Sequence, residues 1–372
     1  MKPYIPDTLP LDSIDWTSHI QEISKANLEL GNLSGSLKAI VNPSVLLSPL
    51  TLREAVLSSK IEGTQATLQE VLFYEASPDE SNPKWEDIQE VVNYRKALFY
   101  VIEALKKKPM NLNTIREMHR ILMTSVRGKN QYPGEFRKDQ NWIGPKGSSI
   151  DQAYFVPPNP NDMRLGLDNF EMYWHSSDKD KIVQLAVIHA QFEILHPFRD
   201  GNGRIGRAIL PIFLVEHGLM ADPVFYFSEY LESFREEYYS SLRRITEAKD
   251  WNQWISFFLK GFAIQAKAIR SKADKILVLY DTMKREIYSL GTSYSLPVLD
   301  ALFTMPIFSS TEFAKYTTMP KTSANRFFST LMEKGILEQV SEGQGSRAST
   351  YQFSKLIDIV DASLAFQMGD TN

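Results

Sequence analysis

Apolar side chains recur at intervals of three and four residues along most of this 372-residue chain. This spacing gathers them on one face of an α-helix and does not fit the alternation of a half-buried strand. The sequence therefore predicts a mainly α protein. The segments with this helical period are 50–74, 84–106, 113–126, 161–174, 181–195, 204–217, 230–245, 251–269 and 272–290.

Residues 132–160 interrupt the helical pattern. Glycine and proline are frequent there, and short extended pieces surround Trp142 and Ile143 and, further on, residues 154–156. Such punctuation is typical of strands and tight turns rather than of helices. We expect a β-hairpin flap inserted among the helices.

The C-terminal part begins after a polar break at residues 291–293. Three short helical stretches, 296–303, 309–316 and 321–334, precede two strands that a polar turn at 341–345 separates. This order resembles a winged-helix module. We therefore expect an N-terminal helical region (1–110), a core (111–265), a linker helix (266–291) and a winged-helix-like domain (292–372).

Composition narrows the class of protein. The chain has 41 Lys and Arg against 45 Asp and Glu, so it lacks the positive excess that non-specific nucleic-acid binding uses. Cysteine is absent, which excludes disulfides, thiolate catalysis and cysteine-ligated zinc. Prolines 3, 6 and 10 break up the N-terminus, and the apolar run 208–215 is too short to span a bilayer. We expect a cytoplasmic protein without a membrane segment.

The densest cluster of chemically active residues is 196–207, which reads HPFRDGNGRIGR. Its glycines fit the G-x-G-x-x-G fingerprint of dinucleotide-binding proteins, but that fingerprint follows a β-strand. Here the preceding residues 181–195 have a helical period. The cluster is thus predicted to be a loop between two helices.

Such a loop can bind an anion. Gly201 and Gly203 permit backbone conformations that turn successive N–H groups toward one point, at the positive end of the next helix. Arg204 and Arg207, three residues apart, share a helix face and can contact a polyphosphate.

Two further residues of the loop add catalytic chemistry. Asp200 can hold a Mg²⁺ ion that also bridges phosphate oxygens. His196 can accept a proton from an attacking hydroxyl near neutral pH. The combination is typical of a transfer reaction at phosphorus.

The loop resembles the motif of the Fic family, His-x-Phe-x-Asp-Gly-Asn-Gly-Arg-x-x-Arg, and matches it at every defined position. The resemblance extends over about residues 112–261, and it implies a Fic helical core with a flap. It also implies an ATP- and Mg²⁺-dependent enzyme that transfers AMP to a Ser, Thr or Tyr hydroxyl of a protein. Members that transfer other groups usually depart from this loop pattern, so the intact second glycine favours adenylylation.

The resemblance also implies roles for individual residues. His196 would be the general base, Phe198 the buried anchor of the loop and Asp200 the Mg²⁺ ligand. The remaining residues would bind ATP. They are Gly201, Asn202 and Gly203 as the phosphate nest, Arg204 at the inner phosphates, Arg207 at the γ-phosphate, Trp142, Ile143 and Gly144 in the flap, and Tyr238 or Tyr239 near the adenine.

A second motif lies upstream. Ser58 and Glu62, followed by Gly63, resemble the inhibitory signature of the family, Ser/Thr-x-x-x-Glu-Gly/Asn. The carboxylate of Glu62 would pair with Arg207 and occupy the place of the γ-phosphate. This pairing predicts an enzyme held inactive by its own N-terminal region.

Two alternatives remain open at this stage. One is a regulator that senses nucleotide through the core and binds DNA through its C-terminal module. The other is a Fic enzyme that moves a different group, such as UMP or a phosphoryl group. The basic residues of the module are few and are offset by acidic ones, so a protein target or a homodimer is favoured over DNA. These residues are Lys321, Arg326, Lys334 and Arg347 against Glu333, Glu338 and Glu342.

The other histidines are weaker candidates for a functional site. A metal pair of His189 with His196 is conceivable, but a core role for His189 is favoured. His19, His119, His175 and His217 have no partners at metal-ligand spacing and are assigned no function.

Overall fold

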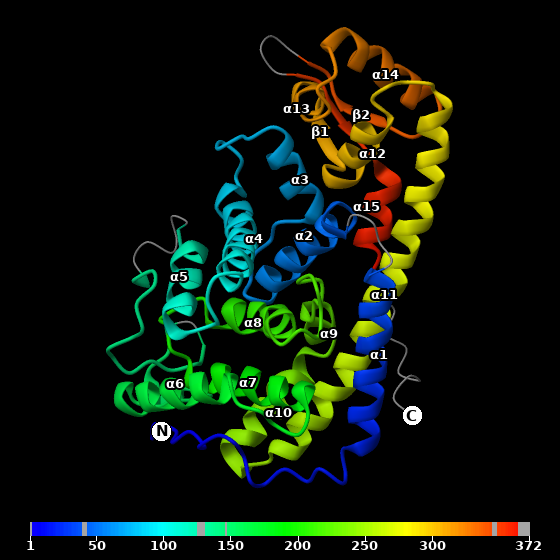
Figure 1. The fold of residues 1–372 in the computed structure, drawn as a ribbon. Helices are drawn as coiled ribbons and strands as arrows, with labels where there is room; N and C mark the ends of the chain where they lie inside the picture. Colours follow the sequence, from blue (N-terminus) through cyan, green and yellow to red (C-terminus); the bar gives the residue numbers. More distant parts are fainter. Residues whose placement is uncertain (1, 39–42, 125–130, 146, 344–347, 364–372) are drawn as a thin grey trace. The chain divides into compact units, whose positions relative to one another are not determined.

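The computed structural model of the chain describes residues 2–38, 43–124, 131–145, 147–343 and 348–363 (Figure 1). These residues form two compact units. The first combines the N-terminal residues up to 34 with 93–267, and the second combines 35–92 with 268–363. Helices α1 (Ile20–Lys38), α4 (Trp85–Leu105) and α11 (Trp251–Ser289) contribute residues to both units.

Helix α7 (Lys181–Leu195) is the core of the first unit. From Ile182 to Leu195 its side chains are buried on all sides except at Glu193, as expected of a helix that is apolar around its whole circumference. It packs against α6 (Pro160–Trp174), α8 (Asn202–Glu216) and α10 (Arg235–Ala248). The same unit contains α5 (Leu112–Leu122) and α9 (Ser228–Ser233).

Local hydrogen bonds fix where α7 begins and how it is held. The Asp180 side chain accepts from the N–H groups of Ile182 and Val183, both at 2.9 Å, and so caps the first turn. The indole N–H of Trp254 in α11 donates to the carbonyl of Ala186 at 2.8 Å. The central helix is thereby fixed at its start and in its middle.

The second unit is built from helices and one small sheet. Its helices are α2 (Pro43–Ile61), α3 (Leu68–Ala76), α12 (Ser295–Thr304), α13 (Ser310–Tyr316), α14 (Lys321–Glu333) and α15 (Ser354–Asp361). Strands β1 (Ile307–Ser309), β2 (Glu338–Ser341) and β3 (Thr350–Gln352) pair antiparallel in the order β1-β3-β2. Phe308 pairs with Tyr351 in this sheet, and their rings pack with those of Phe313 and Phe328 to form the core.

The N-terminal helices α2 and α3 share this core. Helix α2 packs on α12 and α15, and α3 packs on β1. Arg53 of α2 forms an ion pair with Asp361 of α15 at 2.5 Å, and Gln69 donates to Gln352 at 3.0 Å. The expected domain limits at 110, 265 and 291 stay a prediction.

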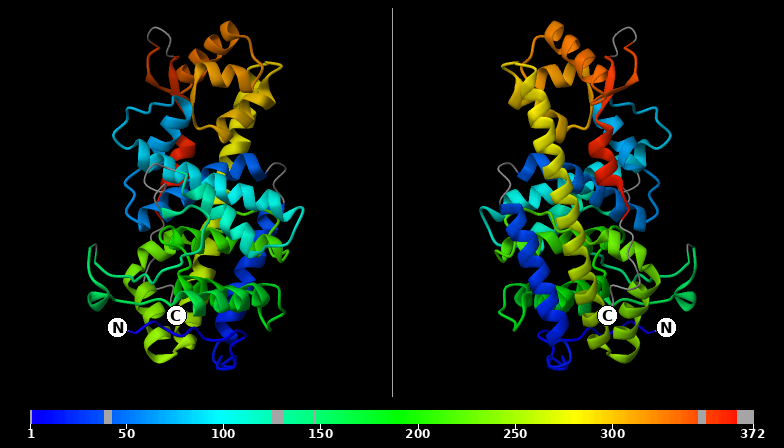
Figure 2. Two further views of the ribbon diagram at one scale, coloured as in Figure 1. Left: turned by 90° about the vertical axis from the view of Figure 1, so that its left-hand side faces the viewer. Right: turned by 90° about the vertical axis from the view of Figure 1, so that its right-hand side faces the viewer.

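Most predicted helices are present, but their boundaries differ at three places. The segment 50–74 is broken after Ile61, where Gly63 has a φ of +101° and Thr67 begins α3 with a capping box. The segment 230–245 is divided at Phe234 between α9 and α10. Conversely, 251–269 and 272–290 form the single helix α11, which Figure 2 shows without a break. Among the described residues, no helix combines the length and apolar character needed to cross a membrane.

The flap is shorter than the predicted hairpin. It contains one antiparallel bridge, between Ile143 and Phe155, and a 3₁₀ turn (Ile150–Gln152). Glycines and prolines on both sides of the bridge explain this, because proline cannot donate to a ladder and glycine weakens a strand.

In the C-terminal module, the three predicted helices are followed by the β2–β3 hairpin, and β1 was not expected. Part of the predicted turn, together with Arg347, lies outside the described residues. The winged-helix assignment stays a prediction.

Candidate active site

His196 lies immediately after α7, in the left-handed backbone conformation with a φ of 45°. Its N–H still donates to the carbonyl of Phe192 at 3.1 Å, so it closes the last turn of the helix. Pro197 follows and cannot extend the helix. The half-buried imidazole is thus held at a sharp turn between α7 and the loop.

Asn202 braces the loop from inside. Its side-chain Oδ1 accepts from the N–H of Phe198 at 2.8 Å, and its Nδ2 donates to the carbonyl of the same residue at 2.9 Å. Phe198 itself is fully buried, as expected for the anchor of the loop. Because both ends of its amide bond the backbone of Phe198, the side chain of Asn202 fixes the shape of the loop.

His119 of α5 holds the other side of the loop, a role that its sequence context did not reveal. Its ring stacks on Phe198 with the centroids 3.7 Å apart. Its Nδ1 accepts from the N–H of Gly134 at 2.9 Å, so its Nε2–H donates to the carbonyl of Asp200 at 3.0 Å. Burial lowers the pKa of His119 to about 4, which keeps the ring neutral near pH 7. No local pattern could indicate this role, because the partners are distant in sequence.

The first turn of α8 forms the anion cradle. Gly201 is its N-cap, with a φ of +78°, and has no side chain with which to cap the first N–H groups. A Cβ on Gly201 would lie 3.1 Å from Sδ of Met123, so glycine also suits the close packing. These N–H groups, at the positive end of a helix dipole, suit a phosphate.

Three charged side chains belong to the loop and the first two turns of α8. Arg204 and Arg207 are only 4% and 2% exposed, so their guanidinium groups act in a medium that screens charge less than water does. Asp200 accepts from the N–H of Gly201 at 2.6 Å and lies 3.6 Å from Nη2 of Arg204. The side chain of Asp200 is 52% exposed, at the mouth of the loop.

The Asp200 carboxylate fits a Mg²⁺ ligand. Mg²⁺ usually takes one or two protein carboxylates and completes its shell with phosphate oxygens and water. The described part of the chain has no group of three or more His, Asp or Glu side chains that could hold a metal ion. A single exposed carboxylate beside a phosphate cradle suits an ion that arrives with its nucleotide.

His189 and Tyr238 lie beneath the loop, in the core. Nδ1–H of His189 donates to the carbonyl of Gly206 at 3.0 Å, and its Nε2 accepts from the Tyr238 hydroxyl at 3.2 Å. Both residues are almost completely buried. The expected core role of His189 is confirmed. The hydroxyl of Tyr238 is bonded to His189 inside the helix packing, and the expected place of Tyr238 near the nucleotide stays a prediction.

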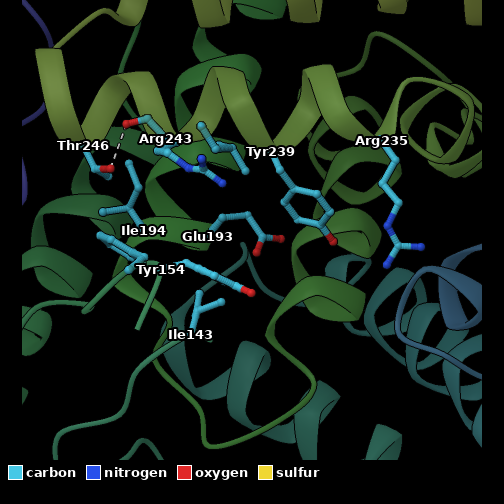
Figure 3. Close-up of a pocket in the computed structure, with 10 residues that line it drawn as sticks. Ile143, Tyr154, Glu193, Ile194, Arg235, Tyr239, Arg243 and Thr246 are labelled. Carbon is cyan, nitrogen blue, oxygen red and sulfur yellow. Dashed lines mark hydrogen bonds between the residues drawn. The ribbon is translucent and has the colours of Figure 1, made fainter. Parts of the chain in front are cut away.

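A pocket of about 410 Å³ lies beside the loop, between the flap, α7 and α10 (Figure 3). Tyr239 lines it and is 42% exposed, and the Glu193 side chain also faces it. The full lining comprises Ile143, Tyr154, Phe155, Glu193, Ile194, Arg235, Tyr239, Leu242, Arg243 and Thr246. Its volume and its mixture of apolar, aromatic and charged walls suit a small molecule with a planar ring.

Of the three flap residues expected to bind nucleotide, one lines the pocket and two do not. Ile143 lines the pocket. Trp142 and Gly144 are not among its lining residues; the indole N–H of Trp142 donates to the carbonyl of Ser148 at 3.1 Å. A Cβ on Gly144 would lie 3.2 Å from Cα of Ala153, so this glycine permits close packing within the flap.

The residues of the inhibitory signature belong to the second unit. Ser58 is buried within α2. Glu62 is the first residue beyond this helix, and its N–H still donates to the carbonyl of Ser59 at 3.0 Å. Gly63 then turns the chain, so the Glu62 carboxylate stands at an exposed helix end.

Comparison with known families identifies the chain. The model described as Fic/DOC family N-terminal matches residues 20–103, and the Fic/DOC family model matches residues 109–214. The second match includes α5, the flap, α7, the loop and most of α8. The chain belongs to the Fic/DOC family.

Two curated relatives agree with this assignment. Two proteins named protein adenylyltransferase Fic, from Drosophila ananassae and Drosophila virilis, are 30% and 31% identical over 133 and 134 residues. Each match covers 35% of this chain and spans about a quarter of the relative, 24% and 25% respectively.

Two solved structures share the fold. One is a Fic family protein from Desulfovibrio desulfuricans G20, with 18% identity and a TM-score of 0.54 over 95% of this chain and 98% of that one. The other is a Fic domain containing signaling protein from Bacteroides thetaiotaomicron VPI-5482, with 17% identity and a TM-score of 0.50 over 68% and 96%. At these identities the likeness describes the fold alone.

Proposed function

We propose that this chain is a protein adenylyltransferase, which transfers AMP from ATP to a hydroxyl side chain of a protein. The observation that carries the proposal is the juxtaposition at one loop of His196 with an uncapped helix N-terminus and two buried arginines. The Drosophila relatives named protein adenylyltransferase Fic, which match this region, add support.

The residues of the loop would divide the reaction between them. The N–H groups of α8 with Arg204 and Arg207 would bind the phosphates and orient the α-phosphorus toward the attacking oxygen. His196 would take the proton of the target hydroxyl. A bond forms between that oxygen and the α-phosphorus while the bond to the β-phosphate oxygen breaks, and pyrophosphate leaves with the electron pair.

Mg²⁺ would be held at Asp200 together with the phosphates, and when bound it would neutralise part of their negative charge. The chain itself contributes the half-exposed carboxylate, which the N–H of Gly201 orients from one side.

The nucleoside would occupy the pocket beside the loop. Tyr239 offers an exposed aromatic face for stacking, and Ile143 offers an apolar surface on the flap. Of the two tyrosines expected near the adenine, we propose Tyr239 for the base, since it lines the pocket.

We also propose that Glu62 inhibits the enzyme by pairing with Arg207 in place of the γ-phosphate. The support is the residue pattern of the signature and the exposed position of Glu62 at the end of α2. Under this proposal Glu62→Gly is the active form on which experiments are best performed.

Radiolabelled ATP tests the activity. Compared with the extract alone, the Glu62→Gly chain incubated with Mg²⁺ and a protein extract should add label from the α-phosphate of ATP to protein and no further label from the γ-phosphate. Transfer of the γ-label would instead identify a phosphoryl transferase, and label from UTP would identify uridylylation. His175→Ala is the matched control for His196→Ala. His175 lies at the exposed end of α6, where it is bonded to the carbonyl of Met110.

A further inference from the structure

Arg137 is a buried cation that is bonded to main-chain carbonyls. It lies between α5 and the flap and is 2% exposed. Its guanidinium donates to the carbonyls of His196 at 2.9 Å, Asp139 at 3.1 Å, Leu195 at 3.3 Å and Pro158 at 2.5 Å. Its own N–H donates to the carbonyl of Pro197 at 2.9 Å.

The chemistry of these acceptors explains why a cation is tolerated here. Leu195 and His196 end α7, where carbonyl groups lack helical partners and the helix dipole is negative. A guanidinium is the side chain suited to this place, because its planar fork carries five donors. Burial lowers the pKa of Arg137 to about 10, so the group stays charged near pH 7.

The four acceptors come from three different stretches of chain. Asp139 precedes the Ile143–Phe155 bridge of the flap and Pro158 follows it. Leu195 and His196 form the turn that carries the imidazole. One side chain therefore ties both ends of the flap to the backbone of His196.

His196 needs such a restraint. A φ of 45° is sparsely populated by residues other than glycine and persists only where the surroundings fix it. The contact of Arg137 with the carbonyl of this residue, and with the next carbonyl along the chain, supplies that fixation.

We propose that Arg137 is a positioning residue, which locks the backbone of His196 and both ends of the flap into one frame. The proposal rests on the proposed function of His196 as the base, and it assigns Arg137 no contact with substrate. Its loss should weaken the chemical step more than nucleotide binding, since the phosphates would be bound by α8 and only the nucleoside would contact the flap.

Arg137→Lys tests this, since lysine keeps the charge but loses the fork. In the Glu62→Gly background we expect kcat for AMP transfer to fall at least tenfold, while the Kd for ATP changes less than about threefold. Arg120→Lys, at an exposed ion pair with Glu117 on α5, is the matched control and should change neither. An unchanged kcat in a folded Arg137→Lys chain would overturn the proposal, and so would equal losses of kcat and ATP affinity.

A second measurement does not depend on activity. In the unmutated chain the Nε–H of Arg137 should exchange with solvent far more slowly than that of Arg120. Arg137→Lys should speed amide exchange in two places together, at 140–144 with 147–156 in the flap and at His196 with Phe198 in the loop. Fast exchange at Arg137, or faster exchange in only one of the two segments, would contradict the proposed role of Arg137 as a clamp, that is, as the side chain that holds both ends of the flap and the backbone of His196 together. If the Glu62→Gly chain transfers no AMP, the proposed function fails, whereas this measurement still decides whether the clamp exists.

Discussion

At the scale of single residues, the site depends on a histidine held at a helix end. His196 occupies a left-handed turn shortly before the N-terminus of α8, and under the proposed function its imidazole would accept the proton of the target hydroxyl. We expect His196→Ala to bind ATP with nearly unchanged affinity while transfer falls by about 100-fold or more. Calorimetry and a transfer assay on the same preparation check this. Comparable transfer by the variant would remove His196 from the mechanism.

His119 should matter for stability as well as for loop shape. His119→Phe keeps a ring to stack on Phe198 but removes the acceptor for the N–H of Gly134 and the donor to the carbonyl of Asp200. Leaving such buried groups without partners should lower the free energy of unfolding by about 1–3 kcal/mol. Urea denaturation measures this change. No loss of stability would show that water replaces both bonds.

Single residues also show which parts of the candidate site can be predicted from the sequence alone. The loop 196–207 was predictable because its residues are adjacent, so spacing alone indicated which of them could act together. His119 was not predictable, because it contacts residues 134 and 200 only after folding. Tyr238 and Tyr239 are neighbours on one helix, and only packing decided which is buried and which lines the pocket.

At the scale of elements, α7, α8 and α10 are joined beneath the loop by His189, with Arg207 nearby. Burial lowers the pKa of His189 from 6.5 to about 4. The unfolded chain therefore binds a proton between these two values that the folded chain does not, and stability must fall as pH decreases from 6.5 toward 4. The full contribution is on the order of 3 kcal/mol.

Unfolding measured between pH 7 and pH 4 checks this prediction. In the unmutated chain, part of the decrease comes from His119, whose pKa burial also lowers. His189→Gln, which has no titrating group, should show a smaller decrease than the unmutated chain. Equal pH dependence in the two proteins would mean that His189 is protonated similarly in both states.

The elements themselves were largely predictable, because helical period is a local property. The limits of α7 agree with those predicted, and the capping Asp180 marks its start. The break between α2 and α3 was missed because apolar spacing continues through it, whereas the left-handed Gly63 interrupts the backbone. The flap was overestimated as a hairpin because its strand-forming residues are separated by glycine and proline.

At the scale of the whole molecule, the N-terminal helices and the C-terminal module form one compact unit. The sequence could not predict this, because the two parts are separated by the whole Fic core. Helix α2, which ends next to Glu62, packs on α12 and α15. The C-terminal module thus supports the helix that carries the inhibitory signature.

That support can be tested at Arg53, which pairs with Asp361 of α15. If α2 must be held for Glu62 to inhibit, Arg53→Ala should raise AMP transfer. Asp361 is 61% exposed, so the pair itself contributes at most about 1 kcal/mol, which corresponds to an increase of about fivefold. Asp361→Asn, which leaves the buried Arg53 in place, isolates this contribution. Lys106→Ala removes an exposed pair with Glu103 and serves as the control. A transfer rate at or below that of the unmutated chain would mean that inhibition by Glu62 does not depend on the attachment of α2 to α15.

If Glu62 inhibits by pairing with Arg207, the effects of substituting these two residues on AMP transfer should not be additive. Glu62→Gly should raise transfer in the unmutated chain but should have no effect in an Arg207→Ala background, because both residues act through one contact. Initial rates of the four proteins form the double-mutant cycle that measures this coupling. Additive effects would mean that Glu62 does not act through Arg207.

The most direct test of the proposed activity is the intact mass of the chain and its protein targets after incubation with ATP and Mg²⁺. The Glu62→Gly protein should gain, or give to a target, the mass of one AMP for each modified hydroxyl. The Glu62→Gly, His196→Ala double variant should produce no such gain. A gain matching a phosphoryl group, or equal AMP transfer by the double variant, would contradict adenylylation by the loop at His196.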